Sequence, residues 1–329
     1  MQNVSTHPYA ALMPDVVLDA VDARGYLTDG RLLALNSYEN RVYQVGIEDS
    51  VPLIVKFYRP GRWSTAQILE EHRFALELEE HEITVVAPLS IEGETLFEHA
   101  GFRYAIYPRR GGHAPEPGRL DQLEWLGRFI GRMHAVGSAQ RFEHRVRLSP
   151  QLMGRNSVAL LEQGDWLPDY LRGNFLDVAG QLLDIVETRF GSDNWTTLRL
   201  HGDCHPGNIL WTDAGPHFVD LDDCLTGPAI QDIWMLLAGP RHERELQLRT
   251  FLEGYEQFRL FDPVELLLIE PLRTLRMIHY MGWLAQRWDD PAFPAAFTWF
   301  GTPRYWEDQL NDLREQVEAL AAPVLRLQP

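Results

Sequence analysis

One segment constrains the fold of this 329-residue chain more than any other, LRLHGDCHPGNILW at residues 198–211. Strand-like residues flank a polar loop, whose chemically active side chains are those of His201, Asp203, His205 and Asn208. The turn-forming run TDAGP follows, and then Asp220. We expect residues 209–211 and 217–219 to pair as a β-hairpin across this turn. The hairpin would bring Asn208 and Asp220 side by side at one end.

The spacing of these polar residues matches one kind of chemistry. Asp203 and Asn208 are five residues apart, as in the kinase catalytic loop H-R-D-x-x-x-x-N. Phosphoryl transfer needs a carboxylate that accepts the proton of the attacking hydroxyl, and it needs oxygen ligands for Mg²⁺. One Asp, one Asn and a second Asp at position 220 meet both needs, so the pattern predicts a phosphotransferase.

A kinase also needs a lysine on a strand to hold the ATP phosphates, and a helical glutamate to orient that lysine. Lys56 lies near the end of the apolar run at residues 53–57, where a buried and unpaired charge would be costly. The predicted helix at residues 64–80 offers Glu70 and Glu71. We favour Glu71, fifteen residues after Lys56, although the register of the helix leaves both open.

The chain divides into two differently patterned parts at residues 109–118 (RRGGHAPEPG), a run typical of a linker. Residues 1–110 predict a nucleotide-binding N-lobe with strands at 42–45, 53–57, 84–89 and 102–107. Residues 111–329 predict a helical C-lobe that holds the catalytic loop (198–211) and a metal-binding hairpin (209–223). In this part, Asp121 is the expected N-cap of a helix that stops at Gly137, and further helices are expected near 175–190, 243–258, 264–288 and 304–321.

The composition fits a soluble enzyme and argues against several other classes. Hydrophobic residues make up 45% of the chain and charged residues 23%. A net charge of −17 disfavours a general role on nucleic acids or anionic membranes. The chain has two cysteines and no CxxC pair, so we expect no disulfide scaffold. It has no apolar run near the roughly 18 residues of a membrane span and no secretion signal, so we expect a cytoplasmic protein. We also expect a monomer.

These residues resemble the aminoglycoside phosphotransferase and choline kinase-like branch of the protein kinase-like fold, which also has HGD in place of HRD. More closely, the chain resembles the bacterial stress response kinase A family, cytoplasmic proteins that phosphorylate Ser and Thr of protein substrates. The closer resemblance covers nearly the whole chain and is carried by residues 35–44, 55–60, 68–76, 198–211, 219–223 and 290–294.

The resemblance implies an α+β, bilobal fold with ATP and Mg²⁺ in the cleft, acting in a stress response. The resemblance implies or supports three roles. Asp203 (the base) and Asp220 would be catalytic, and Asn208 and Asp220 would bind the metal ion. ATP would be bound by Ser37, Lys56, Glu71, Ile106 and Tyr107. Ser37 matches a family serine near ATP, and the backbone around Ile106 and Tyr107 would receive adenine.

The chain departs from protein kinases in three ways. The nucleotide loop at residues 36–40 has no glycine, so side chains such as Ser37 would replace backbone donors. Gly202 stands where HRD kinases carry arginine. Four residues separate Asp222 from Gly227, which leaves no room for an activation loop.

Other readings of the same residues stay open. A small-molecule alcohol kinase (aminoglycoside, choline or homoserine kinase-like) would share the phosphate-handling residues, and an acidic acceptor pocket would distinguish it. A scaffold without turnover is disfavoured by the complete residue set. A zinc site at His201, Cys204, His205 and Asp220 is a weaker alternative. Cys204 is expected to be a packed thiol rather than a redox switch. The aromatic residues near the C-terminus are expected to lie mainly in the hydrophobic core.

Overall fold

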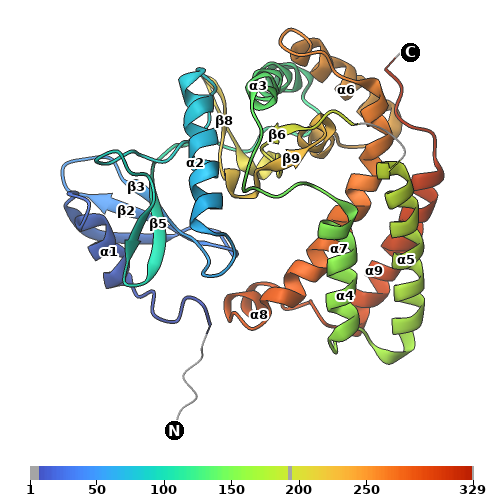
Figure 1. Cartoon of the computed structure of the whole chain (residues 1–329), viewed down its shortest axis with the longest axis horizontal. Helices are drawn as coiled ribbons and strands as arrows, with labels where there is room; N and C mark the ends of the chain where they lie inside the picture. Colours follow the sequence, from blue (N-terminus) through green and yellow to red (C-terminus); the bar gives the residue numbers. More distant parts are fainter. Residues whose placement is uncertain (1–6, 192–194, 328–329) are drawn as a thin grey trace.

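The computed structural model describes residues 7–191 and 195–327. A β-sheet N-lobe lies beside a mainly helical C-lobe (Figure 1), which confirms the bilobal fold class predicted from the sequence. The N-lobe contains α1 (Pro14–Asp22), β1 (Thr28–Ala34), β2 (Arg41–Ile47), β3 (Leu53–Phe57), α2 (Thr65–Glu80), β4 (Phe97–His99) and β5 (Phe102–Pro108). The C-lobe contains α3 (Leu120–Ala139), α4 (Asn156–Gln163), α5 (Asp169–Gly191), β6 (Leu198–Leu200), β7 (Ile209–Thr212), β8 (Gly215–Phe218), β9 (Leu225–Gly227), α6 (Arg241–Tyr255), α7 (Ile269–Arg287), α8 (Ala292–Ala296) and α9 (Pro303–Ala321).

The N-lobe sheet is antiparallel, with strand order β1-β2-β3-β5-β4. Successive residues of a strand face opposite sides of a sheet, and β3 uses both sides. Val55 and Phe57 are buried in the core that the sheet forms with α1. Lys56 therefore points to the other face, where α2 lies. The alternation along β3 is what aims a charged side chain at the space between the lobes.

Helix α2 begins as the sequence predicts. The Ser64 hydroxyl accepts a hydrogen bond from the Gln67 backbone, and the Gln67 side chain accepts one from the Ser64 N–H, a capping box that satisfies two exposed donors. Phe74 and Leu78 are fully buried in the core that continues into the C-lobe. Helix α2 is thereby fixed between the sheet and the C-lobe.

The predicted strand at residues 84–89 is wrong. This segment forms no continuous ladder, because β4 occupies the edge of β5 next to the turn at Ala100 and Gly101. It makes an isolated bridge between Val85 and Phe218 and one hydrogen bond from the Leu89 N–H to the Ile106 carbonyl. Pro88 also removes a backbone donor from the segment. The segment instead ties the N-lobe to β8. Helix α1 and strand β1 lie at positions where no element was predicted.

The first helix of the C-lobe differs from the prediction at both ends. Helix α3 begins after Arg119, and Asp121 pairs with that arginine instead of capping the helix. The helix continues through Gly137 to Ala139. Gly137 packs against the carbonyl of Arg199, where a Cβ would lie 2.3 Å from the oxygen. The glycine therefore permits close contact with β6 and does not end the helix.

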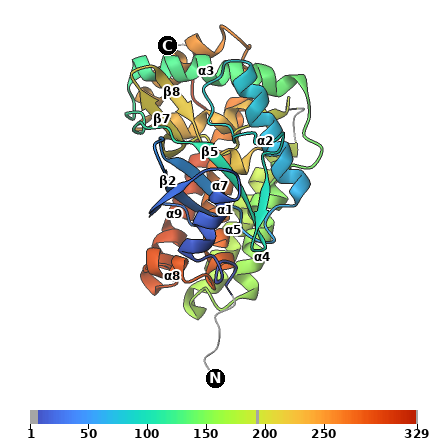
Figure 2. The same cartoon turned by 90° about the vertical axis from the view of Figure 1, so that its left-hand side faces the viewer.

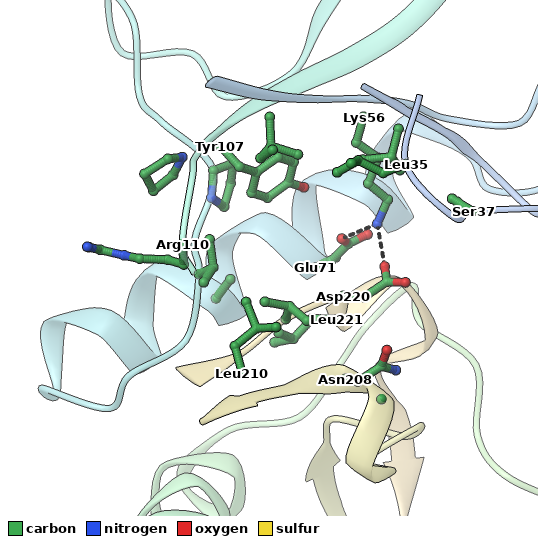
Figure 3. A pocket seen from close by; sticks show the side chains of 18 of the residues that line it. Leu35, Ser37, Lys56, Glu71, Tyr107, Arg110, Asn208, Leu210, Asp220 and Leu221 are labelled. Atoms are coloured by element: carbon green, nitrogen blue, oxygen red, sulfur yellow. Dashed lines mark hydrogen bonds and ion pairs between the residues drawn. The ribbon is translucent and has the colours of Figure 1, made fainter. Parts of the chain in front are cut away.

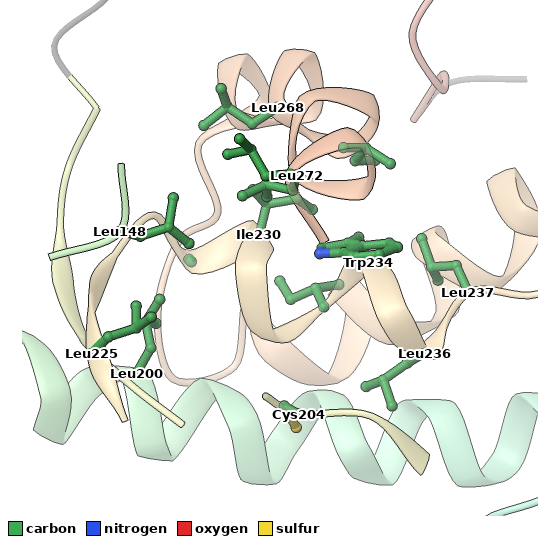
Figure 4. Close-up of a cluster of buried hydrophobic side chains, with 14 of the residues drawn as sticks. Leu148, Leu200, Cys204, Leu225, Ile230, Trp234, Leu236, Leu237, Leu268 and Leu272 are labelled. Carbon is green, nitrogen blue, oxygen red and sulfur yellow. The ribbon is translucent and has the colours of Figure 1, made fainter. Parts of the chain in front are cut away.

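The other predicted helices are present as α5, α6, α7 and α9, and α4, α5, α7 and α9 pack together (Figures 1 and 2). Under the catalytic loop lies a buried apolar cluster that includes Leu200, Leu225, Ile230 and Trp234 (Figure 4). It gives the loop a rigid base. Across the described ranges, no helix has both the length and the apolar character that a membrane span requires.

Candidate active site

A cavity of about 400 Å³ lies between the lobes, lined by residues from the N-lobe sheet, α2 and the β7–β8 hairpin (Figure 3). Of the residues predicted for the site, the cavity is lined by Ser37, Lys56, Glu71, Tyr107, Asn208 and Asp220. Asp203 lies on the catalytic loop next to Asn208, and Ile106 is not part of the lining. The fold thus brings together most of the predicted set from positions far apart in sequence.

Lys56 is the only lysine in the sequence. Its side chain is 7% exposed, and Nζ lies 3.4 Å from Glu71 Oε1, 3.0 Å from Asp220 Oδ1 and 3.2 Å from Asp222 Oδ1. Burial would lower the pKa of Lys56, but the three carboxylates outweigh burial and raise it well above its usual value. The lysine is therefore a permanent cation in the cavity, suited to polyanion binding.

The two candidate glutamates of α2 have different partners. Glu71 contacts Lys56 inside the cavity (Figure 3). Glu70 points away and accepts hydrogen bonds from the backbone N–H groups of Glu143, His144 and Arg145, at 2.6–2.8 Å. It thereby anchors the segment after α3, and Glu71 is the one placed to orient the lysine.

The loop between β1 and β2 is held by side chains, since it has no glycine. Asn40 donates from Nδ2 to Asp222 Oδ2 at 3.0 Å and accepts at Oδ1 from the Arg59 N–H at 3.1 Å. Ser37 lines the cavity, and its hydroxyl donates to the Asn40 carbonyl at 3.2 Å. Asn40 was not singled out from the sequence, and it fastens the loop between β1 and β2 to the C-lobe.

At the end of β5, the structure separates the two residues expected near adenine. The Ile106 side chain is fully buried in the N-lobe core, and its carbonyl accepts from the Leu89 N–H at 2.7 Å. Tyr107 faces the cavity, where its hydroxyl lies 3.0 Å from that of Tyr58. The Tyr107 side chain therefore lines the cavity and the Ile106 side chain does not, while the backbone contact with adenine stays a prediction.

The backbone of the catalytic loop is held by Asp232, a residue that the sequence analysis did not identify. Both carboxylate oxygens of Asp232 accept backbone N–H groups, from His201 and from Gly202, at 2.8 Å each. Gly202 has φ +87°, and a Cβ there would lie 2.1 Å from the carbonyl oxygen of Asp223. Glycine is thus required at position 202 for the loop to pass close to the backbone of Asp223.

Asp203 carries several partners. Arg276 Nη1, from α7, donates to its Oδ1, and His205 Nε2 lies 3.5 Å from its Oδ2. Burial would raise the pKa of Asp203, but the hydrogen bond with His205 and the charge of Arg276 hold it well below its ordinary value. The side chain is 25% exposed. Asp203 is therefore an ionised carboxylate open to an acceptor molecule.

The predicted hairpin forms, with Ile209 opposite Phe218 and Thr212 opposite Gly215, so its second strand lies at 215–218 and not at the predicted 217–219. Asn208 and Asp220 stand at its open end, and the amide oxygen of Asn208 points toward Asp220 (Figure 3). Asn208 Nδ2 is occupied by the Asp203 carbonyl at 3.0 Å. Asp220 has the left-handed backbone conformation, φ 59°, which costs free energy in a residue with a Cβ and is typical of functional positions.

The donor set at this end of the hairpin fits Mg²⁺. Asp220 is 52% exposed at its side chain, and it offers a carboxylate next to the amide oxygen of Asn208. Hard oxygen ligands with room for water and phosphate oxygens are what Mg²⁺ requires. Asn208 and Asp220 are therefore the residues that would hold a Mg²⁺ ion here.

A second layer of paired charges surrounds the hairpin. Arg62, from the loop before α2, contacts both Asp222 and Asp223. Burial would raise the pKa of Asp222, but Arg62 and Lys56 outweigh burial and keep it low. The two carboxylates are visible in the sequence as the run LDD at 221–223. Their partner Arg62 is more than 150 residues away, so the sequence did not indicate the pairing. Arg62 thereby fixes the chain after Asp220 without an activation loop.

The structure does not support the hypotheses of a zinc site or of a redox switch at Cys204. Within residues 7–191 and 195–327, no group of three or more His, Cys, Asp and Glu side chains is arranged for a metal ion. Cys204 is fully buried in the apolar cluster below the loop (Figure 4), and burial raises the pKa of its thiol well above the usual value. Phe293 and Trp306 of the aromatic stretch are likewise core residues.

The two lobes and the charged cavity between them define a class of protein, the phosphotransferases with a kinase-like fold. The chain matches the phosphotransferase enzyme family (APH) over residues 31–267. Stress response kinase A of Escherichia coli O157:H7 is 46% identical over 327 residues, with 99% of each chain covered. The chain therefore belongs to the stress response kinase A family, and it is a kinase.

Two further proteins extend this comparison. The serine/threonine protein kinase RdoA of Salmonella typhimurium strain LT2 is 46% identical over 329 residues, again with 99% of each chain covered. Among solved structures, amicoumacin kinase hAmiN, in complex with AMP-PNP, Ca²⁺ and Ami, matches with a TM-score of 0.67 and 21% identity, covering 87% of this chain and 90% of that chain. The latter likeness shows a shared fold.

Proposed function

We propose that this protein transfers the γ-phosphoryl group of ATP, with Mg²⁺, to Ser and Thr hydroxyls of protein substrates. It does so as a cytoplasmic monomer in a bacterial stress response. The observation that carries the proposal is the convergence of Lys56, Asn208 and Asp220 on one cavity beside Asp203. The full-length likeness to relatives named as stress response and Ser/Thr kinases supports the substrate class.

Each residue has a defined task in this reaction. Lys56, oriented by Glu71, binds the phosphates, while Ser37 and the loop held by Asn40 cover them. Asn208 and Asp220 would hold Mg²⁺, which would neutralise part of the negative charge of the phosphates. Asp203 orients the acceptor hydroxyl and takes its proton as the new oxygen–phosphorus bond forms. Catalysis is thus positioning and electrostatic stabilisation, with no covalent enzyme intermediate.

Two acidic residues at the contact between the lobes are already paired with arginines, so neither is a free site for a polycationic small molecule. Glu39 is paired with Arg59 and Arg287 at 3.1 and 3.0 Å, and Asp290 with Arg41 and Arg59 at 2.8 and 2.7 Å. An aminoglycoside would need carboxylates that are free to bind its ammonium groups. Here arginines already neutralise these carboxylates.

A labelling experiment tests the proposal. Purified protein is incubated with labelled ATP and Mg²⁺, alone, with a basic model protein such as histone, and with a panel of aminoglycosides and choline-like alcohols. We expect label on protein Ser or Thr, absent in Asp203→Asn. Label only on a small alcohol would assign the chain to the small-molecule kinases, as the fold shared with an amicoumacin kinase makes conceivable.

A further inference from the structure

Arg276 contacts Asp203, but the reaction described above gives it no task. It lies on α7, 73 residues after Asp203, and its side chain is 45% exposed. A guanidinium has five N–H donors in a planar fork. Within the described chain, the contact with Asp203 is the one polar contact of this side chain. Its remaining donors are available to a molecule bound at Asp203.

The part of the catalytic loop that follows β6 provides no permanent cation. Residues 201–210 (HGDCHPGNIL) contain neither Lys nor Arg. Lys56 contacts Asp220 and Glu71 on the phosphate and metal side of the cavity. On the acceptor side of Asp203, Arg276 therefore supplies a positive charge from another part of the fold.

The reaction geometry places this charge beside the group in transfer. An acceptor hydroxyl that gives its proton to Asp203 lies about 2.6–3.2 Å from the carboxylate. The same hydroxyl oxygen lies about 3–3.5 Å from the γ-phosphorus in a reactive complex. A guanidinium already bonded to Asp203 is thus within reach of the non-bridging oxygens of the phosphoryl group, on which the transition state spreads its charge.

We propose that Arg276 is a further catalytic residue, whose guanidinium bridges Asp203 and the phosphoryl group during transfer. The acceptor oxygen bonds to phosphorus while the bond from phosphorus to the β-phosphate oxygen breaks. ADP leaves with that electron pair, and the hydroxyl proton passes to Asp203 and then to solvent. Arg276 stabilises the charge of the phosphoryl oxygens throughout. This assignment rests on the proposed kinase function.

The test compares a ground state with a transition-state mimic, so that no acceptor has to be known. Thermal unfolding is measured with Mg·ADP and with Mg·ADP plus aluminium fluoride, which imitates a phosphoryl group in transfer. For Arg276→Gln we expect the same stabilisation by Mg·ADP as in the wild type. The additional stabilisation by aluminium fluoride should be lost, and Arg276→Lys should retain part of it.

A matched control lies one turn earlier on α7. Arg273 pairs with Glu270 and lies over the Trp234 ring, away from Asp203, and Arg273→Gln should keep the full response to aluminium fluoride. The turnover of Arg276→Gln should fall about 10²–10³-fold, as for loss of one transition-state donor, with KM for ATP within about twofold because Arg276 does not line the ATP cavity.

An Asp203→Asn background separates a direct role from an indirect one. If Arg276 touches the phosphoryl group, replacing it in this background should reduce the aluminium fluoride response further. An unchanged response there would mean that Arg276 acts only through Asp203, and would overturn the proposal, as would an unchanged response in the single variant. A wild type that Mg·ADP and Mg·ATP both fail to stabilise would instead overturn the proposed kinase function, and this inference with it.

Discussion

Lys56 Nζ lies 3.0 Å from Asp220 Oδ1, so an ion pair joins the N-lobe sheet to the C-lobe hairpin. One partner is the cation proposed for the ATP phosphates, and the other is the carboxylate proposed for Mg²⁺. The pair places both functions on one side of the cavity, and Asp203 lies on the other side of Asn208. In the proposed reaction, nucleotide binding and acceptor activation are therefore tasks of separate residues, which makes them separable by mutation.

The single lysine of the chain allows a direct test of ATP placement. An acyl-phosphate derivative of ATP transfers its acyl group to a nearby amine, and Lys56 is the only side-chain amine in the sequence. We expect modification at Lys56, detected by mass spectrometry and prevented by excess Mg·ATP. Lys56→Arg should keep the charge and lose the modification. Labelling of Lys56 that excess Mg·ATP does not reduce would argue against phosphates binding at this residue.

Asp203→Asn should separate chemistry from binding. The variant keeps the size of the side chain but loses the carboxylate that orients and deprotonates the acceptor, so we expect turnover to fall about 10²–10⁴-fold. Stabilisation by Mg·ATP should remain, because Lys56, Asn208 and Asp220 are unchanged. Kinetics with labelled ATP and thermal unfolding are measured side by side. Wild-type turnover in this variant would remove Asp203 from the role of base.

The parts of this fold that sequence predicted are those in which local pattern and final position agree. Strand β3, helix α2 and the β7–β8 hairpin each carry their own alternation, cap or turn. Their local preferences therefore persist in the fold. The relative placement of Asn208 and Asp220 followed from the hairpin alone. The segment at 84–89 has strand-like residues, but a strand also needs a continuous partner edge, which its own sequence does not show.

The missed residues of the site act over long separations in the chain. Asn40 reaches Asp222 across 182 residues, and Arg276 reaches Asp203 across 73. No periodicity connects such pairs, since each contact arises only when distant parts of the chain pack together. Asp232 is similar, because its role depends on loop backbone above it and not on a motif around it. Polar contacts between residues far apart in the chain therefore form the part of the site that sequence patterns do not predict.

The adjacent glutamates of α2 offer a matched pair of variants. Glu71→Gln removes a partner of Lys56, and we expect kcat/KM for ATP to fall about 10–100-fold through misplacement of the lysine. Glu70→Gln weakens three backbone hydrogen bonds, and the free energy of unfolding should fall by about 1–3 kcal/mol while the folded protein stays active. Urea unfolding and steady-state kinetics distinguish the two. If Glu70→Gln lowered kcat/KM and Glu71→Gln lowered only the stability, Glu70 would be the residue that orients Lys56.

His72 should make the protein sensitive to acid. Its ring is buried between Tyr58 and Thr95, at 2.7 and 2.8 Å, and burial, aided by the charge of Lys56, lowers its pKa to about 3 from 6.5. The folded state then binds fewer protons than the unfolded state between these values, so stability is complete above pH 6.5 and is lost as the pH falls toward 3. At pH 5 this one group costs about 2 kcal/mol relative to pH 8.

Urea unfolding of His72→Gln at pH 8 and pH 5 measures this contribution. The variant should be less stable than the wild type at pH 8 and should lose less stability on acidification. Thr95→Val is the control, because it removes a hydrogen-bond partner and leaves the buried imidazole. It should therefore keep most of the wild-type loss between the two pH values. Equal losses in wild type and His72→Gln would show that other groups cause the acid sensitivity.

Asp220→Ala should impair binding of the nucleotide with its metal ion. The substitution removes the proposed Mg²⁺ carboxylate and also a partner of Lys56, whose charge Glu71 and Asp222 still balance. Because a ligand stabilises the folded state according to its affinity, the rise in Tm with Mg·ATP should shrink strongly. Alanine also adopts the left-handed backbone of this position poorly, so the Tm without nucleotide serves as the reference for each variant.

Asp213 provides the control, since it is an exposed aspartate in the turn of the same hairpin. Asp213→Ala removes the same charge from the same element without touching the cavity, and it should keep the wild-type response to Mg·ATP. A titration of Mg²⁺ at fixed ATP adds a second criterion, because loss of a ligand shifts the metal dependence to higher concentration. If Asp220→Ala and Asp213→Ala respond alike in both measurements, the metal must bind elsewhere, and the pairing of Asp220 with Lys56 would then serve only to join the lobes.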